Sequence, residues 1–201
     1  MEKIISIANS KGGVGKSTTA HNLVPLLDIT NVIDQDIHTS LSVLREGVIA
    51  PKSSDELINF LIESKGSTII DCGGFDSDVN RKAIAVSDLV IVPTSDEPTE
   101  FVGLSKFGAT LKAIMEDFDV KIEAYVLINR VSPNRKHFKE IEQYVNESSV
   151  FKLLDSKLPT RKEYSIAMFS GSTVCEYSKT KHSVAARELK SLAKELKSIL
   201  S

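Results

Sequence analysis

Residues 1–19 read MEKIISIANSKGGVGKSTT, and this stretch decides the fold. Residues 4–8 are a short, mostly β-branched apolar run that is typical of a buried strand. A loop rich in glycine covers residues 9–15, and residues 16–20 begin a helix. This order of elements, a strand followed by a glycine loop and the N-terminus of a helix, is typical of a phosphate site. Glycine lets the backbone N–H groups of the loop turn towards the phosphate, and the helix dipole adds partial positive charge. The stretch therefore predicts a nucleotide-phosphate site.

The glycine loop departs from the standard phosphate-binding pattern G-x-x-x-x-G-K-[ST]. Ser10 stands where that pattern has its first glycine, and a second lysine, Lys11, opens the run KGGVGKS. Lys16 can reach the β- and γ-phosphates of a nucleotide, and the Ser17 hydroxyl can coordinate Mg²⁺. A glycine turn with unrelated lysines is the alternative interpretation, which the strand and the helix on either side disfavour.

This run resembles the deviant Walker A box, KGGxGK[ST], of the ParA/MinD family of ATPases. The resemblance implies that the whole loop binds ATP, through Lys11, Gly12, Gly13, Val14, Gly15, Lys16, Ser17 and Thr18. It also implies that Lys11 reaches the phosphates held by a second copy of the chain, which couples dimer formation to ATP. Lys11 and Lys16 are therefore expected to be catalytic residues.

Two carboxylates, Asp34 and Asp36, follow the next predicted strand, residues 31–33. Side chains two residues apart on an extended chain point the same way, and at the C-terminal end of a parallel strand they aim into the ligand crevice. We assign Asp34 to Mg²⁺, and a solvated strand end is the alternative for the pair. The pair resembles the family motif D-x-D-P-Q, which implies that Asp36 orients the attacking water and senses the γ-phosphate. Ile37 and His38 replace the Pro-Gln, and we interpret His38 as a surface residue, with a phosphate or metal contact as the alternative.

Another acidic strand end lies at Asp71, after the buried run of residues 68–70. A carboxylate in that place is typical of a Walker B acid, which holds Mg²⁺ through water. The glycine pair in residues 72–74 predicts a mobile switch loop whose amides meet the γ-phosphate. We expect Asp76 and Asp78 to be capping or solvent residues.

Asn129 lies near the end of a further predicted strand, residues 124–130. The resemblance implies that its amide meets the adenine, since an amide offers both a donor and an acceptor. An Asx turn before Pro133 is the alternative. Residues 158–164 and 171–176 resemble the tail of short ParA proteins, which implies a segment that closes over the nucleotide and helps to form the dimer face.

Strand and helix patterns alternate along the chain, which predicts an α/β fold with a doubly wound, mainly parallel sheet and helices on both faces. The expected helices are 16–27, bent or ended by Pro25, then 40–45, 54–63 with Ser54 and Asp55 as its N-cap, 99–117, 134–147 and 183–200, and a further strand is 88–93. We expect one ATPase domain over residues 1–201, with no N-terminal helix-turn-helix domain.

The 201 residues carry a net charge of −2, but the charge is unevenly spread. Residues 1–100 hold 8 Lys and Arg against 15 Asp and Glu, whereas residues 101–201 hold 17 against 12. A basic second half can face a polyanion. Cys72 and Cys175 form no C-x-x-C pair, which favours a reducing cytoplasm and disfavours iron–sulfur relatives. The sequence has no run of about 18 apolar residues and no signal-peptide pattern.

The last predicted helix has an apolar stripe and a basic face with Arg187, Lys190, Lys194 and Lys197. Its interpretations stay open: a solvated face of a core helix, a surface for non-specific DNA, or a helix that lies on a membrane. Further basic residues would extend a DNA surface if they shared this face: Arg130, Arg135, Lys136, Lys139, Lys179 and Lys181.

The function that the resemblance implies is an ATP-dependent dimerising switch with weak ATPase activity. Its catalytic residues are Lys11, Lys16 and Asp36, its cofactors ATP and Mg²⁺, and its Mg²⁺ ligands Ser17, Asp34 and Asp71. The ATP-bound homodimer is expected to bind non-specific double-stranded DNA and to partition a plasmid or chromosome with a ParB-like centromere-binding partner, in the cytoplasm and on the nucleoid. A MinD-like membrane-cycling ATPase and a metabolic ligase of the dethiobiotin synthetase type are the alternatives, and we expect no membrane association.

Overall fold

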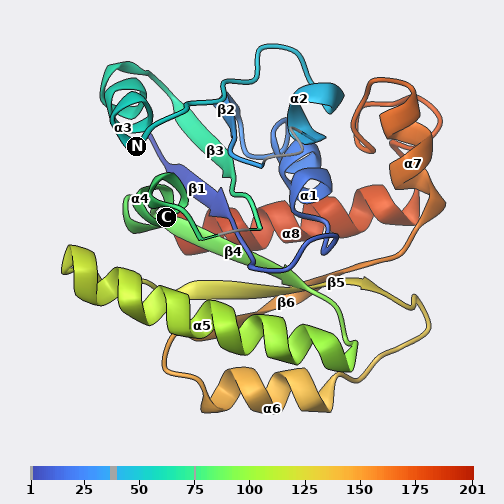
Figure 1. Ribbon diagram of the computed structural model, residues 1–201. Helices are drawn as coiled ribbons and strands as arrows, with labels where there is room; N and C mark the ends of the chain where they lie inside the picture. The colour runs from blue at the N-terminus through green and yellow to red at the C-terminus, as the bar shows by residue number, and fades with distance from the viewer. Residues whose placement is uncertain (1, 37–39, 75) are drawn as a thin grey trace.

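The computed structural model describes residues 2–36, 40–74 and 76–201. Within those ranges six parallel strands form one sheet in the order β2-β3-β1-β4-β5-β6 (Figure 1). The strands are β1 Ile4–Ile7, β2 Ile29–Asp34, β3 Ser67–Asp71, β4 Leu89–Thr94, β5 Ala124–Val131 and β6 Phe151–Pro159. The strand order changes direction between β1 and β4, which is where ligands bind in sheets of this kind.

Helices cover both faces of the sheet (Figure 1). One face carries α3 Ser54–Glu63, α4 Asp78–Ala85, α5 Pro98–Phe118 and α6 Lys139–Glu147, and the other carries α1 Lys16–Leu23, α2 Ser40–Leu44, α7 Lys162–Phe169 and α8 Val184–Leu200. Successive strand residues serve the two layers alternately, so that Ile70 belongs to the first apolar cluster and Ile69 to the second. This arrangement confirms the predicted doubly wound α/β fold. None of the helices in the described ranges combines the length and the apolarity that a membrane crossing needs.

The register of the strands brings the predicted carboxylates to one edge of the sheet. Asp34 at the end of β2 lies opposite Asp71 at the end of β3, and Asp71 lies opposite Ile7 at the end of β1. The glycine loop leaves β1 directly after this point. Because the strands are parallel, the loop and both carboxylates meet at the same crevice.

The start of α3 differs from the prediction. The sequence predicts Ser54 and Asp55 as the N-cap. In the structure Ser53 is the cap residue, and its hydroxyl accepts the N–H of Glu56 at 3.2 Å. Ser54 is buried inside the helix, and its hydroxyl donates to the carboxylate of Asp78 on α4. The neighbouring helix therefore decides which serine is the cap.

The first helix ends before Pro25, which agrees with the predicted effect of this proline, but earlier than the predicted end at residue 27. Helix α1 stops at Leu23, and a turn follows in which the Leu27 N–H donates to the Leu23 carbonyl at 2.9 Å. Helix α6 begins at Lys139, later than predicted, because Phe138 has a non-helical backbone (φ −132°, ψ 47°) and a buried ring.

The sequence did not predict β6, α4 or α7. Strand β6 lacks a regular alternation because its register against β5 shifts in the middle. At this irregularity the N–H groups of Asp155 and Ser156 donate to the carboxylate of Glu195 on α8, at 2.6 and 2.9 Å. The Glu195 carboxylate thus accepts the backbone N–H groups of β6 at the point where the pairing with β5 is interrupted.

Candidate nucleotide-binding site

The phosphate loop connects β1 to α1 and contains glycines in the left-handed backbone region. Gly13 has φ +78° and Gly15 has φ +93°, values that residues with a side chain rarely adopt. Gly15, which has no side chain, is the N-cap of α1. The first N–H groups of the helix, and its dipole, are therefore directed towards the space in front of the loop, where an anion would bind.

A pocket of about 590 Å³ opens in front of the loop. It is lined by Gly12, Gly13, Gly15, Lys16, Ser17, Thr18, Asp36, Ser40, Val43, Leu44, Arg130 and Met168. Lys16 is only 4% exposed, and its Nζ donates to the Lys11 carbonyl at 3.3 Å, so the ammonium lies within the curve of the loop. The structure thus brings Lys16, Ser17, Thr18 and Asp36 together around one pocket, and their roles at a nucleotide stay predictions.

Replacement of Gly15 by alanine is expected to destabilise the loop. A Cβ at this position would lie 2.4 Å from Asn129 Nδ2, and the backbone has φ +93°. Strain and overlap together should lower the free energy of unfolding by about 3 kcal/mol and weaken nucleotide binding. Thermal denaturation with and without ATP measures both effects.

Gly47→Ala is the matched control for that substitution. Gly47 also has a left-handed backbone (φ +71°), but a Cβ there would meet nothing within 4 Å. It should therefore show the strain alone, about 1 kcal/mol, with ATP binding unchanged. Equal losses in the two variants would show that the Asn129 contact has no influence.

Asp71 has the surroundings of a magnesium-site carboxylate. It is fully buried, and within the described part of the chain neither of its oxygens has a hydrogen-bond partner. Burial raises its pKa to about 7; the nearby Ser17 hydroxyl and Lys16 ammonium oppose the rise, and the charge of Asp34 adds to it. A buried carboxylate in this state needs a cation or a proton. Asp71 and Ser17 therefore fit Mg²⁺ in the manner of other phosphate loops, with a hydroxyl ligand and a carboxylate that acts through water.

Asp34 and Asp36 are placed differently. One oxygen of Asp34, Oδ2, accepts the N–H groups of Leu41 and Ser42, each at 3.0 Å, and the Ser42 hydroxyl at 3.1 Å. Its Oδ1 accepts the Asp36 N–H at 3.0 Å. Asp34 thereby fixes the start of α2, and its role as a Mg²⁺ ligand stays a prediction. Asp36 lines the phosphate pocket, whereas the prediction for His38 lies outside the described residues.

A second pocket, of about 210 Å³, adjoins the loop beside β5 and α7. It is lined by Gly15, Thr18, Thr19, Asn129, Arg130, Leu158, Pro159, Thr160, Arg161, Tyr164 and Ser165. The Asn129 amide donates to the Val14 carbonyl at 2.7 Å, and its contact with adenine stays a prediction. Arg130 donates to the Gly13 carbonyl from a left-handed backbone (φ +58°). Arg130 therefore lines both nucleotide pockets, away from the basic face of α8 that it was to extend if it shared that face.

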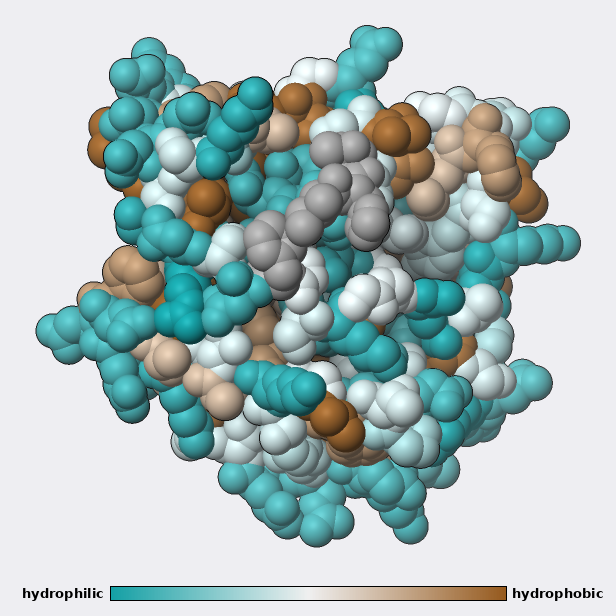
Figure 2. Space-filling view, in the orientation of Figure 1, coloured by the Kyte–Doolittle hydropathy of each residue, from teal (hydrophilic) through white to brown (hydrophobic). Residues whose placement is uncertain are grey.

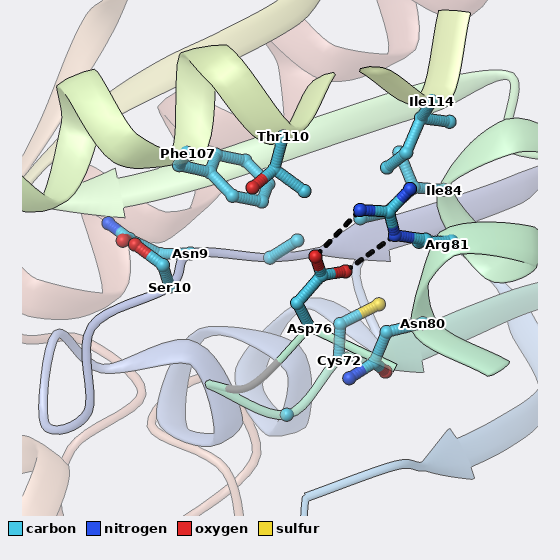
Figure 3. A pocket seen from close by; sticks show the side chains of 12 residues that line it. Asn9, Ser10, Cys72, Asp76, Asn80, Arg81, Ile84, Phe107, Thr110 and Ile114 are labelled. Atoms are coloured by element: carbon cyan, nitrogen blue, oxygen red, sulfur yellow. Dashed lines mark hydrogen bonds and ion pairs between the residues drawn. The ribbon is translucent and has the colours of Figure 1, made fainter. Parts of the chain in front are cut away.

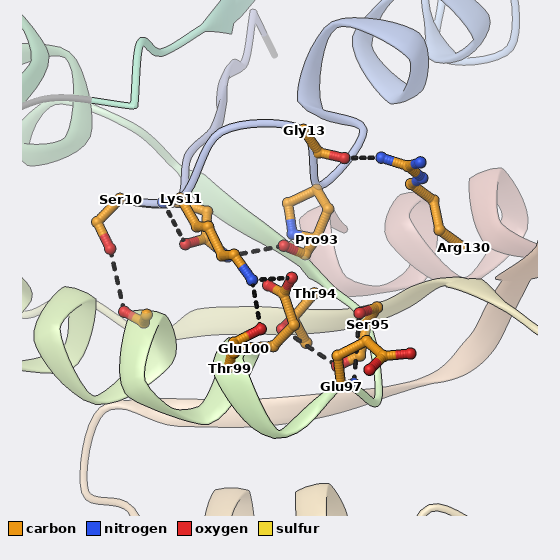
Figure 4. A network of polar contacts seen from close by, with 12 residues as sticks. Ser10, Lys11, Gly13, Pro93, Thr94, Ser95, Glu97, Thr99, Glu100 and Arg130 are labelled. Atoms are coloured by element: carbon orange, nitrogen blue, oxygen red, sulfur yellow. Dashed lines mark hydrogen bonds and ion pairs between the residues drawn. The ribbon is translucent and has the colours of Figure 1, made fainter.

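The structure adds contacts at the start of the loop that the sequence interpretation missed. Asn9 donates from Nδ2 to the Pro93 carbonyl at 2.8 Å, and its Oδ1 accepts the Lys11 N–H at 3.0 Å. The Lys11 ammonium donates to Thr99 Oγ1 at 2.8 Å and to Glu100 Oε1 at 2.6 Å (Figure 4). These residues follow β1 and β4, and only the pairing of those strands makes them neighbours.

A small cavity of about 30 Å³ lies between α4 and α5 (Figure 3). Beside it Asp76 forms an ion pair with Arg81 at 2.7 Å, while the Ser77 side chain caps α4. Cys72 also lines it, and burial raises the pKa of this thiol to about 12, so that it stays protonated at neutral pH. The volume suits about one or two water molecules rather than a substrate.

A parallel sheet with a glycine loop after its first strand, a lysine inside the loop and a buried acid on the adjacent strand defines a phosphate-loop nucleotide-binding protein. Residues 5–174 match the model of the CobQ/CobB/MinD/ParA nucleotide binding domain. The chain belongs to this family and is a ParA/MinD-family ATPase.

Known proteins resemble the chain over nearly its whole length. Protein ParA of Rhizobium radiobacter is 28% identical over 211 residues, which cover 92% of this chain and 91% of the relative. A candidate plasmid partition protein of Borrelia burgdorferi B31, bound to AMPPNP, has a TM-score of 0.67 and 20% identity, with 99% of this chain and 98% of that chain covered. The septum site-determining protein MinD of Pyrococcus horikoshii OT3, complexed with Mg-ADP, has a TM-score of 0.72 and 19% identity, with 100% and 99% covered. At these identities the two structures establish the fold alone.

Proposed function

We propose that this chain is an ATP-dependent dimerising switch with weak ATPase activity, which binds non-specific DNA in its ATP state and partitions a plasmid or chromosome. The observation that carries the proposal is the phosphate loop with a second lysine, Lys11, in a chain similar to a ParA protein over 92% of its length. Residues 1–201 would act as one ATPase domain in the cytoplasm and on the nucleoid. A ParB-like centromere-binding partner would stimulate hydrolysis.

The site residues have distinct tasks in this proposal. The loop N–H groups and Lys16 bind the β- and γ-phosphates of ATP. Ser17, and Asp71 through water, would hold Mg²⁺, which would neutralise negative charge on those phosphates. Asp36 orients the water that attacks the γ-phosphorus, so that the bond to the β–γ bridging oxygen breaks and ADP and phosphate leave. Lys11 contacts the phosphates held by the partner protomer, which makes the complete site a property of the dimer.

Apolar side chains are exposed beside the nucleotide pockets. Figure 2 shows them over α2 and α7, at the upper right of the molecule. Val43 on α2 is 82% exposed and also lines the phosphate pocket, and Phe169 on α7 is 94% exposed. Exposed apolar side chains next to polar groups are typical of a contact surface. They support a dimer whose protomers meet face to face at the nucleotide.

The outer face of α8 is basic. Arg187, Lys190 and Lys194 are exposed, whereas the acidic residues of the helix are engaged in internal contacts. Glu188 forms an ion pair with an arginine before α7 at 2.7 Å, and Glu195 accepts the N–H groups of β6. Clustered positive charge suits the phosphate groups of DNA, and such contacts do not read the base sequence.

Part of the predicted basic patch lies elsewhere. Arg135, Lys136 and Lys139 lie at or before the start of α6, which packs on the opposite face of the sheet from α8. Lys179 and Lys181, in contrast, directly precede α8 and are exposed. Lys197, the last residue of the predicted basic face, forms an ion pair with Asp28 at 3.0 Å. The proposed DNA surface therefore consists of Lys179, Lys181, Arg187, Lys190 and Lys194.

The double substitution Lys190→Glu and Lys194→Glu is expected to weaken binding to non-specific duplex DNA by about 100-fold near 0.1 M salt. The slope of log affinity against log salt should become shallower by about 2, one unit for each lost phosphate contact. The double variant Lys136→Glu and Lys139→Glu is the matched control, because it makes the same charge change on the other face of the sheet. Equal losses in both variants would indicate an effect of net charge rather than a surface on α8.

The experiment that tests the proposed function measures binding to non-specific duplex DNA together with solution mass, with ADP and with a non-hydrolysable ATP analogue. The expected result is a dimer that binds DNA with the analogue and not with ADP. A dimer that ignores DNA but co-sediments with liposomes would overturn the partition role in favour of a MinD-like cycle. A monomer under all conditions would overturn the switch itself and return the metabolic ligase to consideration.

A further inference from the structure

The Lys11 side chain is held within its own protomer. Its ammonium donates to Glu100 Oε1 at 2.6 Å and to Thr99 Oγ1 at 2.8 Å, both in the first turn of α5 (Figure 4). The Glu100 side chain is 10% exposed, and within the described ranges its Oε2 takes no hydrogen bond. Lys11 is the ion-pair partner that the described structure gives this carboxylate. An ion pair in which the acid is this well buried is harder to open than one between two solvated side chains.

The surrounding elements prepare this position. The stem of Lys11 lies over Gly103, where an added Cβ would be 3.4 Å from Lys11 Cβ. The Ser10 hydroxyl donates to the Gly103 carbonyl at 3.0 Å, and Asn9 accepts the Lys11 N–H. These two hydrogen bonds hold the backbone at Ser10 and Lys11. Because Gly103 has no side chain, the Lys11 side chain can extend across α5 to Glu100. The contact is therefore built into the fold rather than a chance meeting of two surface charges.

We propose that Glu100 is a positioning residue that retains Lys11 in its own protomer until the ATP dimer forms. The inference rests on the proposed function, in which Lys11 must reach the phosphates of the partner. The same ammonium cannot serve both acceptors, so dimer formation has to open the pair. Opening leaves the Glu100 carboxylate buried without its cation, and this cost opposes dimers that lack the γ-phosphate. Glu100 thus raises the threshold for dimer formation, which the contact of Lys11 with the partner's γ-phosphate must overcome.

Glu100→Gln tests the proposal, because glutamine keeps the shape and one hydrogen bond but removes the charge. The ATP-analogue dimer should then form at about tenfold lower protein concentration, since a neutral hydrogen bond is weaker than a charge-assisted one. Dimer should also become detectable with ADP. Glu97→Gln, the same change on an exposed residue of the same helix end, should leave the concentration dependence unchanged. A weaker dimer in Glu100→Gln would overturn the proposal, because Glu100 would then support Lys11 in the dimer.

A double-mutant cycle separates the retention of Lys11 from a general effect on α5. Lys11→Ala should itself weaken the ATP dimer, so the cycle is measured at high protein concentration. In that background Glu100→Gln should no longer alter the remaining dimer formation or ADP discrimination, because no ammonium remains to be retained. The same shift in both backgrounds would overturn the proposal. Thermal denaturation of each variant shows whether the helix start is intact.

Acylation of lysines by an N-hydroxysuccinimide ester gives a measurement that needs no dimer. In the nucleotide-free monomer Lys11 should react slowly, and Glu100→Gln should raise its rate about fivefold or more, since an amine held between two acceptors is shielded. Lys121, which is 87% exposed, should react equally in both proteins. If Lys11 is labelled faster in Glu100→Gln but no ATP dimer forms, the proposed function is wrong and the Lys11–Glu100 pair is supported. If an ATP dimer forms but Lys11 is labelled equally fast in both proteins, the retention of Lys11 by Glu100 is wrong and the proposed function is supported.

Discussion

Replacement of Lys16 by alanine is expected to lower the affinity for ATP by about 100-fold or more. The ammonium is almost fully buried within the phosphate loop, where its hydrogen-bond partner is a backbone carbonyl. Charge-assisted hydrogen bonds to two phosphate groups are worth about 1.5–3 kcal/mol each, and 1.4 kcal/mol corresponds to a factor of ten. Calorimetric titration with ATP and Mg²⁺ measures the loss directly.

The fold should survive that change. Lys16 forms no ion pair within the described residues, and a buried ammonium without one costs free energy in the absence of ligand, so Lys16→Ala should melt no lower than the wild-type protein. The rise in melting temperature that saturating ATP gives the wild type should vanish, because only bound ligand produces it. Lys121→Ala removes an exposed lysine far from the loop and should retain that rise. Wild-type ATP affinity in Lys16→Ala would contradict the phosphate assignment.

Replacement of Asp36 by alanine is expected to reduce single-turnover hydrolysis by about 100-fold or more while ATP still binds. Asp36 lines the phosphate pocket, follows the end of β2 and donates its N–H to Asp34, which holds the backbone in place. Without the carboxylate the attacking water loses its orientation, whereas Lys16 and the loop amides keep their phosphate contacts. The ATP-bound dimer should therefore accumulate.

Asp55→Ala is the control for Asp36→Ala. Asp55 is an exposed acid in the first turn of α3 and lies outside both nucleotide pockets. Its loss should leave turnover and solution mass unchanged. Wild-type turnover in Asp36→Ala would remove this residue from the chemistry, and loss of ATP binding would show that Asp36 supports the pocket instead.

The predictions that agreed with the structure depended on local patterns. The β1 run, the glycines before Lys16 and the apolar residues before Asp71 lie next to one another in the chain, so spacing alone relates them. The predictions that differed involved distant partners. Ser53 rather than Ser54 caps α3 because Asp78 on another helix engages Ser54, and β6 is irregular where Glu195 of α8 replaces a strand partner.

The sequence by itself determined the phosphate loop, the parallel α/β fold and the strand ends that carry Asp36 and Asp71. They follow from the wide backbone range of glycine, the dipole of a helix and the two-residue repeat of a strand, all of which act over a few residues. Only the tertiary structure placed Arg130 in the nucleotide pockets, directed Asp34 to α2 and brought Lys11 to Glu100. The Arg130 and Lys11 contacts depend on the pairing order of β1, β4 and β5. The chain sets that order through the summed packing of both sheet faces rather than through any single motif. The Asp34 contact is closer in sequence and depends on where α2 begins after β2.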